Sequence, residues 1–111
     1  TINFAAARAA NVTNIYLYGV DNTPTNQVPI TLPFDCTLIA ISASTFTNET
    51  WTAEVHNGLS LVTGASLSIT SATSGYRDDL SIDFNAGDDI ELYCNGTSIA
   101  GPRMDVFFVR R

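Results

Sequence analysis

The chain has 111 residues, of which 14% are charged, and its formal net charge at pH 7 is −6. All five of its basic residues are arginines that are scattered or terminal, so it lacks the cation cluster with which proteins bind nucleic-acid backbones. No stretch of about 18 apolar residues is present for a membrane span, and the first residues lack the pattern of a signal peptide. We therefore expect one soluble, mature domain without a nucleic-acid or membrane partner.

The segment 3–10 is rich in alanine and is the only helix-prone stretch of the chain. Asn3 can serve as its N-cap, although two turns of helix are only marginally stable in isolation. We predict that residues 1–13 form a short arm or helix, which becomes ordered only against another molecule, such as a neighbouring subunit. The docking side chains of this arm are predicted to be Ile2, Phe4 and Arg8.

Residues 14–111 alternate apolar and polar side chains in short segments separated by turn residues, which is typical of β-strands with one buried face. The segment 28–34 alternates too, but its two prolines remove backbone donors and place it at a sheet edge. The segment 36–46 is apolar on both faces and is predicted to be central. The Asn57-Gly58 pair between two alternating segments predicts a β-hairpin.

The final third of the chain, residues 65–111, contains three alternating segments and a closing segment, 104–109, that is apolar on both faces. The whole chain gives about eight strands joined by short turns, without the strand–helix alternation of a parallel sheet. We predict an all-β fold with a single domain over residues 14–111. Its architecture is expected to be an antiparallel two-sheet sandwich, a jelly roll of about eight strands.

The two cysteines, Cys36 and Cys94, fall on the apolar phase of their strands. Their spacing allows either two buried free thiols or a disulfide between the sheets, and we favour the free thiols.

The aromatic side chains divide into two groups. Trp51, Phe84 and Phe108 are in phase with aliphatic neighbours and are predicted to lie in the core. Another group occupies the second face of strands whose first face is already apolar, and a sandwich of this size has no third layer to cover it. We predict a subunit interface there, with a sugar-stacking platform as the rival interpretation. The interface residues are Tyr16, Tyr18, Phe107 and Val109.

The sequence contains no constellation that predicts catalysis. His56 is the only histidine, and its phase opposite Trp51 predicts an exposed or interface position. No serine lies in a nucleophile-elbow motif. The acidic pairs Asp78-Asp79 and Asp88-Asp89 do not match the spacing of an EF-hand loop, and such pairs commonly keep turns solvated. We expect no enzymatic activity, no catalytic residue, no metal and no cofactor.

A family resemblance is carried by the closing segment Phe84-Asn-Ala-Gly-Asp-Asp-Ile-Glu-Leu-Tyr93 and the apolar strand that ends at Arg110-Arg111. These segments resemble the last two strands of jelly-roll domains related to tumour necrosis factor and complement globular heads. In those domains a Gly-Asp turn introduces the penultimate strand, and the chain ends in a central strand at a threefold axis. The resemblance implies a compact homotrimer.

The middle of the chain carries a second resemblance, through Phe34-Asp-Cys-Thr-Leu-Ile-Ala-Ile-Ser-Ala-Ser-Thr45 and Glu49-Thr-Trp-Thr-Ala-Glu-Val-His56. These segments are similar to small β-domains that tailed bacteriophages carry as fibre heads or capsid decoration proteins. Because the chain has no Gly-X-Y, heptad or β-helical stalk, it is more similar to a decoration protein. The resemblance implies a structural virion protein on the capsid surface, synthesised in the host cytoplasm, with the major capsid protein as its partner. The alternative is the receptor- or carbohydrate-binding head domain of a phage fibre, with a glycan as ligand.

Overall fold

The computed structural model describes the backbone of residues 1–111 and all side chains except that of Val20. Its regular structure consists of ten β-strands and one short 3-10 turn, η1 (Val20–Asn22). The all-β prediction is thus confirmed. The strands are β1 (Ile2–Ala7), β2 (Asn11–Val12), β3 (Ile15–Tyr16), β4 (Ile30–Thr31), β5 (Cys36–Asn57), β6 (Ser60–Arg77), β7 (Ile82–Phe84), β8 (Asp89–Asn95), β9 (Ile99–Ala100) and β10 (Arg103–Arg110).

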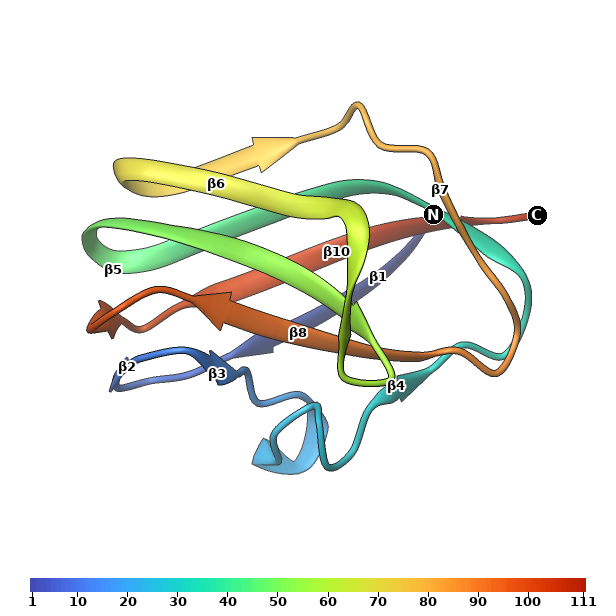
Figure 1. Ribbon diagram of the computed structural model, residues 1–111, viewed down its shortest axis with the longest axis horizontal. Helices are drawn as coiled ribbons and strands as arrows, with labels where there is room; N and C mark the ends of the chain where they lie inside the picture. Colours follow the sequence, from blue (N-terminus) through green and yellow to red (C-terminus); the bar gives the residue numbers. More distant parts are fainter.

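The long strands β5 and β6 connect two antiparallel layers, because the ladder between them is interrupted at a bend after Ser44 (Figure 1). Layer I contains β1, β10, the first half of β5, the end of β6 and β7. Layer II contains the start of β6, the second half of β5, β8, and the short edge strands β3 and β4. The strands β2 and β9 form a separate small sheet. This arrangement agrees with the predicted two-layer sandwich.

The core lies between the two layers and is centred on Phe108, which is fully buried. Its ring makes edge-to-face contacts with Phe4 and Phe84, with centroid distances of 5.9 and 5.5 Å. The predicted core positions of Trp51, Phe84 and Phe108 are confirmed. The cysteines are buried and free, as favoured from the sequence. Aliphatic side chains complete the core, among them Leu17, Leu32, Leu38, Ile41, Val55, Ile90, Leu92 and Val106.

Of the two alternatives predicted for residues 1–13, a short arm or a helix, the helix is wrong, since residues 2–7 form the strand β1. This strand pairs with β10 from Ile2 opposite Phe108 to Ala7 opposite Arg103, and it brings both termini to one end of the molecule (Figure 1). A two-turn alanine-rich helix has little stability of its own, so pairing with β10 and burial of Phe4 outweigh helix propensity. Residues 2–7 therefore belong to the same sheet as β10 and β5.

Two other sequence predictions concern the position of strands within the sheets. The central position predicted for 36–46 is confirmed, because the first half of β5 pairs with β10 on one side and with β6 and β7 on the other. The edge position predicted for 28–34 is also confirmed, although only β4 is regular there and it pairs with β8 alone. The Asn57-Gly58 turn joins β5 to β6 as predicted, with Asn57 opposite Ser60.

Candidate functional site

The outer face of layer I, on both sides of β10, carries mostly small side chains together with a few larger ones. The register sets Phe107 between Asn3 of β1 and Ala40 of β5, and it sets Val109 opposite Thr37. Val109 is 36% exposed and Tyr76 of β6 is 74% exposed, while Phe107 is half-buried. We call this surface the β10 face and define it by Asn3, Ala5, Ala7, Thr37, Ala40, Ser42, Ser44, Tyr76, Arg103, Asp105, Phe107 and Val109.

The charges on the β10 face compensate one another. Arg103 and Asp105 form an ion pair in which Nε and Oδ2 are 2.9 Å apart. The hydrogen bonds that Arg103 donates to Asp105 raise the pKa of the guanidinium, which therefore stays charged and compensates the carboxylate. The protein as a whole carries a net charge of −6. The β10 face is therefore a surface at which a second anionic molecule meets little repulsion.

The structure brings together only two of the four predicted interface residues. Phe107 and Val109 lie on the same face of β10. Tyr16 lies on layer II, where it pairs with Tyr93 of β8. Tyr18 lies beside the end of β1 and covers the Arg8 guanidinium, whose central carbon is 3.7 Å from the ring centroid. The two tyrosines are thus on other parts of the molecule than the β10 face.

The side chains predicted to dock the arm contact their own domain. Ile2 and Phe4 are partly buried against the core. Arg8 donates from Nε and Nη2 to the carbonyl oxygen of Tyr16, at 2.9 and 2.8 Å. The expectation that this segment needs another molecule for its order is corrected, because β10 and Tyr16 of the same chain supply its partners.

A cluster of polar and aromatic side chains surrounds His56 on the side of layer II that faces away from the core. The phenol oxygen of Tyr16 is 2.9 Å from His56 Nδ1, and His56 Nε2 is 2.8 Å from Glu54 Oε1. Asn95 donates to Glu54 Oε2 at 2.7 Å. The ring of Tyr93 stacks on His56 with a centroid distance of 4.8 Å. These contacts join β3, β5 and β8, and we call these five residues the His56 cluster.

His56 is only 8% exposed, so the prediction of an exposed or interface position is wrong. The predicted phase of His56 opposite Trp51 is confirmed, because Trp51 is in the core and His56 is on the other face. The aromatic rings that cover His56 come from Tyr16 and Tyr93, which are far away in the sequence. No local pattern around His56 signals this cover.

Tyr16, His56 and Glu54 follow one another in the order of a catalytic triad, in which a nucleophile contacts a base and the base contacts an orienting carboxylate. The electrostatics oppose that use of Tyr16. Burial, followed by the nearby Glu91, Tyr93 and Glu54, raises the pKa of its phenol and disfavours the phenolate. Burial and Glu54 likewise raise the pKa of Tyr93. The geometry and electrostatics therefore suit a hydrogen-bonded clamp with un-ionised phenols, which holds β3 against layer II.

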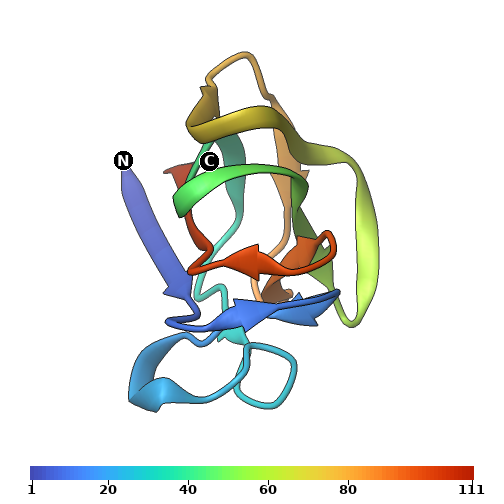
Figure 2. The same ribbon diagram turned by 90° about the vertical axis from the view of Figure 1, so that its left-hand side faces the viewer.

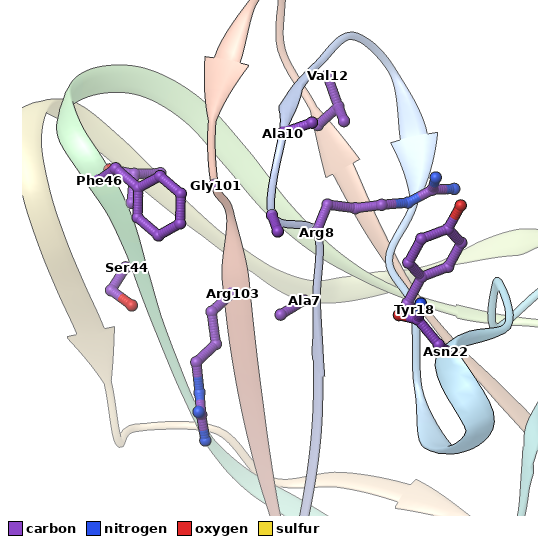
Figure 3. A pocket seen from close by; sticks show the side chains of 12 residues that line it. Ala7, Arg8, Ala10, Val12, Tyr18, Asn22, Ser44, Phe46, Gly101 and Arg103 are labelled. Carbon is purple, nitrogen blue, oxygen red and sulfur yellow. The ribbon is translucent and has the colours of Figure 1, made fainter.

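A pocket of about 520 Å³ lies where β1, the bend of β5 and the start of β10 meet. Figure 3 shows the Phe46 ring over Gly101 on one side and Arg8 extending toward Tyr18 on the other. Phe46 is 69% exposed, and Gly101 leaves space for its ring because a Cβ at this position would collide with it. Ser44 and Asn22 add polar groups to the lining. The pocket thus combines an exposed aromatic ring with hydrogen-bonding groups.

Comparisons with known proteins give no family for this chain. No protein-family model matches it, and a search of curated proteins finds no significant relative. In the part of the chain that the structure describes, no helix is long and apolar enough to cross a membrane. Among the same residues, no three His, Cys, Asp or Glu side chains are grouped as metal ligands.

Proposed function

We propose that this protein is a structural virion protein, a homotrimeric capsid decoration protein whose protomers associate through the β10 face. One observation carries the proposal. The last strand, β10, is in the interior of layer I with Val106 and Phe108 fully buried, and its opposite face still presents Phe107 and Val109. Apolar side chains on the second face of a central strand are typical of a surface that another subunit covers.

The order of the strands supports the resemblance on which the trimer rests. For this comparison each half of β5 and each half of β6 is counted as a separate strand, because the two halves lie in different layers. The short strands β3 and β4 are counted together as one strand, and β7 is counted together with the second half of β6. Numbered in this way along the chain, the strands of layer I have the order 1-8-3-6 and those of layer II the order 2-7-4-5. Two four-stranded layers with this order are characteristic of a jelly roll.

The self-association is tested with a matched pair of exposed valines. Val109 belongs to the β10 face, whereas Val28 is 47% exposed on the segment before β4. By light scattering we expect a mass three times the 11.9 kDa of one chain. Val109→Asp should shift the protein to monomer, because it buries a charge in the interface, and Val28→Asp should leave the trimer intact.

Binding to a capsid is tested by co-sedimentation of the protein with purified empty heads of a tailed bacteriophage. We expect saturable binding that withstands washing. A wild-type protein that is monomeric at all concentrations and does not bind the heads would contradict the proposal. So would a trimer that Val109→Asp and Val28→Asp weaken equally.

A second candidate function is the carbohydrate-binding head domain of a phage fibre. The observation that favours it is the pocket beside Phe46, because exposed aromatic rings with neighbouring hydroxyl and amide groups suit sugar faces. Trp51 takes no part in such a site, since it is 3% exposed in the core. A glycan array is the test: saturable binding that Phe46→Ala removes would support this function. No binding on the array, together with binding to heads, would support decoration.

A further inference from the structure

The strand β1 forms one edge of layer I and has a backbone partner along only part of its outer side (Figure 2). On its inner side it pairs with β10 over its whole length. On its outer side Ala7 exchanges two hydrogen bonds with Tyr18, with N···O distances of 2.8 and 2.9 Å. Beyond Ala7 toward the N-terminus this outer ladder stops.

The register identifies the backbone groups of β1 that remain without a strand partner. Arg8 N–H donates to Pro102 at 2.9 Å, so even-numbered residues direct their backbone groups toward β10. Asn3 and Ala5 therefore direct theirs to the outer side, as Ala7 does. Within the described structure, no other strand pairs with these two residues. Their N–H and C=O groups form the start of an open ladder.

A groove runs along this open ladder. Its first part, of about 450 Å³, has Asn3, Phe4 and Ala5 on one side and the segment 28–30 on the other. Its second part, of about 330 Å³, lies between β1 and the segment 31–36, and Phe4 lines both parts. We call the two parts together the edge groove. Because it has walls on both sides, it suits one extended strand better than the edge of a second folded sheet.

The edge groove lacks the features with which exposed sheet edges usually avoid pairing. Residues 1–7 contain no charged side chain and no proline, although natural edges commonly carry lysine, proline or a bulge. None of the side chains that line either part of the groove is charged, and most are apolar. Val28 on its outer wall is 47% exposed. An occupant should therefore be uncharged and present apolar side chains at alternate positions.

We propose that the edge groove binds one extended, uncharged segment of a partner polypeptide by strand addition to β1. The main-chain groups of Asn3 and Ala5 would supply the hydrogen bonds, and the spaces beside Phe4 would take alternate apolar side chains. This site is on the edge of layer I, whereas the proposed trimer uses the β10 face. Asn3 and Ala5 belong to both surfaces, so the oligomeric state of each Ala5 variant is checked by light scattering. Val109→Asp lies outside the groove and tests the trimer alone.

The open ladder itself is tested without a ligand by amide hydrogen exchange. We expect the amides of Phe4 and Ala6 to be protected and those of Asn3 and Ala5 to exchange rapidly. On addition of a binding peptide, the Asn3 and Ala5 amides should become protected. Slow exchange at all four amides of the free protein would contradict an open edge.

Binding is tested by NMR titration with a set of acetylated, amidated heptapeptides that alternate apolar and small uncharged residues. A separate peptide that copies residues 1–7, Thr-Ile-Asn-Phe-Ala-Ala-Ala, reports whether a second copy of this chain is the better occupant. We expect resonance shifts confined to β1 and the segment 28–34. Ala5→Pro should weaken binding at least about tenfold, because it removes an outward N–H without removing a bond to β10. Ala5→Val keeps that N–H and is the matched control.

Three outcomes would overturn the proposal. The first is the absence of shifts with every peptide of the set at millimolar concentration. The second is binding that Ala5→Pro and Ala5→Val weaken equally while both variants stay folded. The third is a dimer of the whole protein that Ala5→Pro abolishes, since the occupant would then be a second copy of this chain. Ala5→Lys, which places a charge in the groove and keeps the N–H, serves as a second variant if Ala5→Pro does not fold.

Discussion

At the scale of single residues, the His56 cluster shows how buried polar groups constrain one another. His56 is nearly inaccessible, and each of its ring nitrogens has one partner, Tyr16 at Nδ1 and Glu54 at Nε2. A carboxylate only accepts hydrogen bonds, so the tautomer that satisfies both contacts carries its hydrogen at Nε2. In that tautomer Nδ1 accepts the phenol hydrogen of Tyr16. Removal of one partner leaves a buried nitrogen without a hydrogen bond.

Tyr16 and Tyr18 give a matched test of this clamp. We expect Tyr16→Phe to lower the free energy of unfolding by about 1–2 kcal/mol, because it leaves His56 Nδ1 unpaired. Tyr18→Phe should cost less than about 0.5 kcal/mol, since its ring keeps the contact with Arg8. Urea unfolding at pH 7 measures both. Equal costs for the two variants would show that the phenol of Tyr16 does not support the cluster.

The buried thiol of Cys94 should make the folded protein less stable at alkaline pH. Burial, with Glu49 and Glu54 nearby, raises the pKa of its thiol from 9.0 to about 12. Between these pH values the unfolded chain loses this proton and the folded chain keeps it. The stabilisation is therefore complete below pH 9 and is lost as the pH rises toward 12, with a slope of at most about 1.4 kcal/mol per pH unit.

This dependence is measured by urea unfolding of the wild type and of Cys94→Ala at several pH values from 8 to 10. Cys94→Ala should flatten the slope relative to the wild type, whatever its effect on stability at pH 8. Parallel slopes in the two proteins would contradict the assignment to Cys94.

At the scale of elements, β1 shows where local preference loses to tertiary pairing. Its alanines favour a helix, but the inward positions of Ile2, Phe4 and Ala6 match the period of a strand. The register with β10 places Phe4 against Phe108. The same strand closes the core on one side and leaves an open ladder on the other.

Two phenylalanines test the contribution of β1 to the fold. Phe4→Ala should lower the free energy of unfolding by about 2–3 kcal/mol, because it removes a ring packed against Phe108. Phe46→Ala is the matched control at a 69% exposed site, and its cost should stay below about 1 kcal/mol. Urea unfolding distinguishes the two. A negligible cost for Phe4→Ala would mean that β1 is a detachable arm, as first expected from the sequence.

At the scale of the whole molecule, the net charge of −6 acts against any self-association. The proposed trimer brings together three chains that each carry this net charge, although the Arg103–Asp105 pair keeps the β10 face itself nearly neutral. Salt screens repulsion between charges that are separated by more than a Debye length, which is about 10 Å at 0.1 M. Trimer formation should therefore be favoured by salt.

Sedimentation equilibrium measures this dependence. Raising the salt concentration from about 20 to about 500 mM should tighten the trimer several-fold, because the screened repulsion no longer opposes the apolar contact at Phe107 and Val109. Val28→Asp adds charge outside the β10 face and should make the dependence steeper. A trimer that dissociates with rising salt would indicate that ion pairs hold the subunits together.

Most of the fold could be predicted from the sequence. The period of two in the apolar side chains predicted the strands and their buried faces, as at Leu67, Ile69, Ile90 and Leu92. The Asn57-Gly58 pair predicted the hairpin, and the prolines predicted an edge. These signals are local, because the direction of a side chain and the chemistry of a turn depend on neighbouring residues.

The candidate sites could be predicted only in part, because a surface exists only once strands have been paired. The sequence showed that β10 is apolar on both faces, but it could not show that Phe107 and Val109 lie away from Tyr16 and Tyr18. It gave the correct face for His56, yet the rings that bury it come from residues far along the chain.

By itself, the sequence determined most of the strand segments after residue 14, which of their side chains point inward and where the chain turns. The tertiary structure alone decided that β1 is a strand and not a helix, that His56 is buried and that the edge groove is open. Each of these depends on contacts between distant residues, such as Ile2 with Phe108 and Tyr16 with His56. The free energy of those contacts exceeds the small local preferences that a sequence pattern reports.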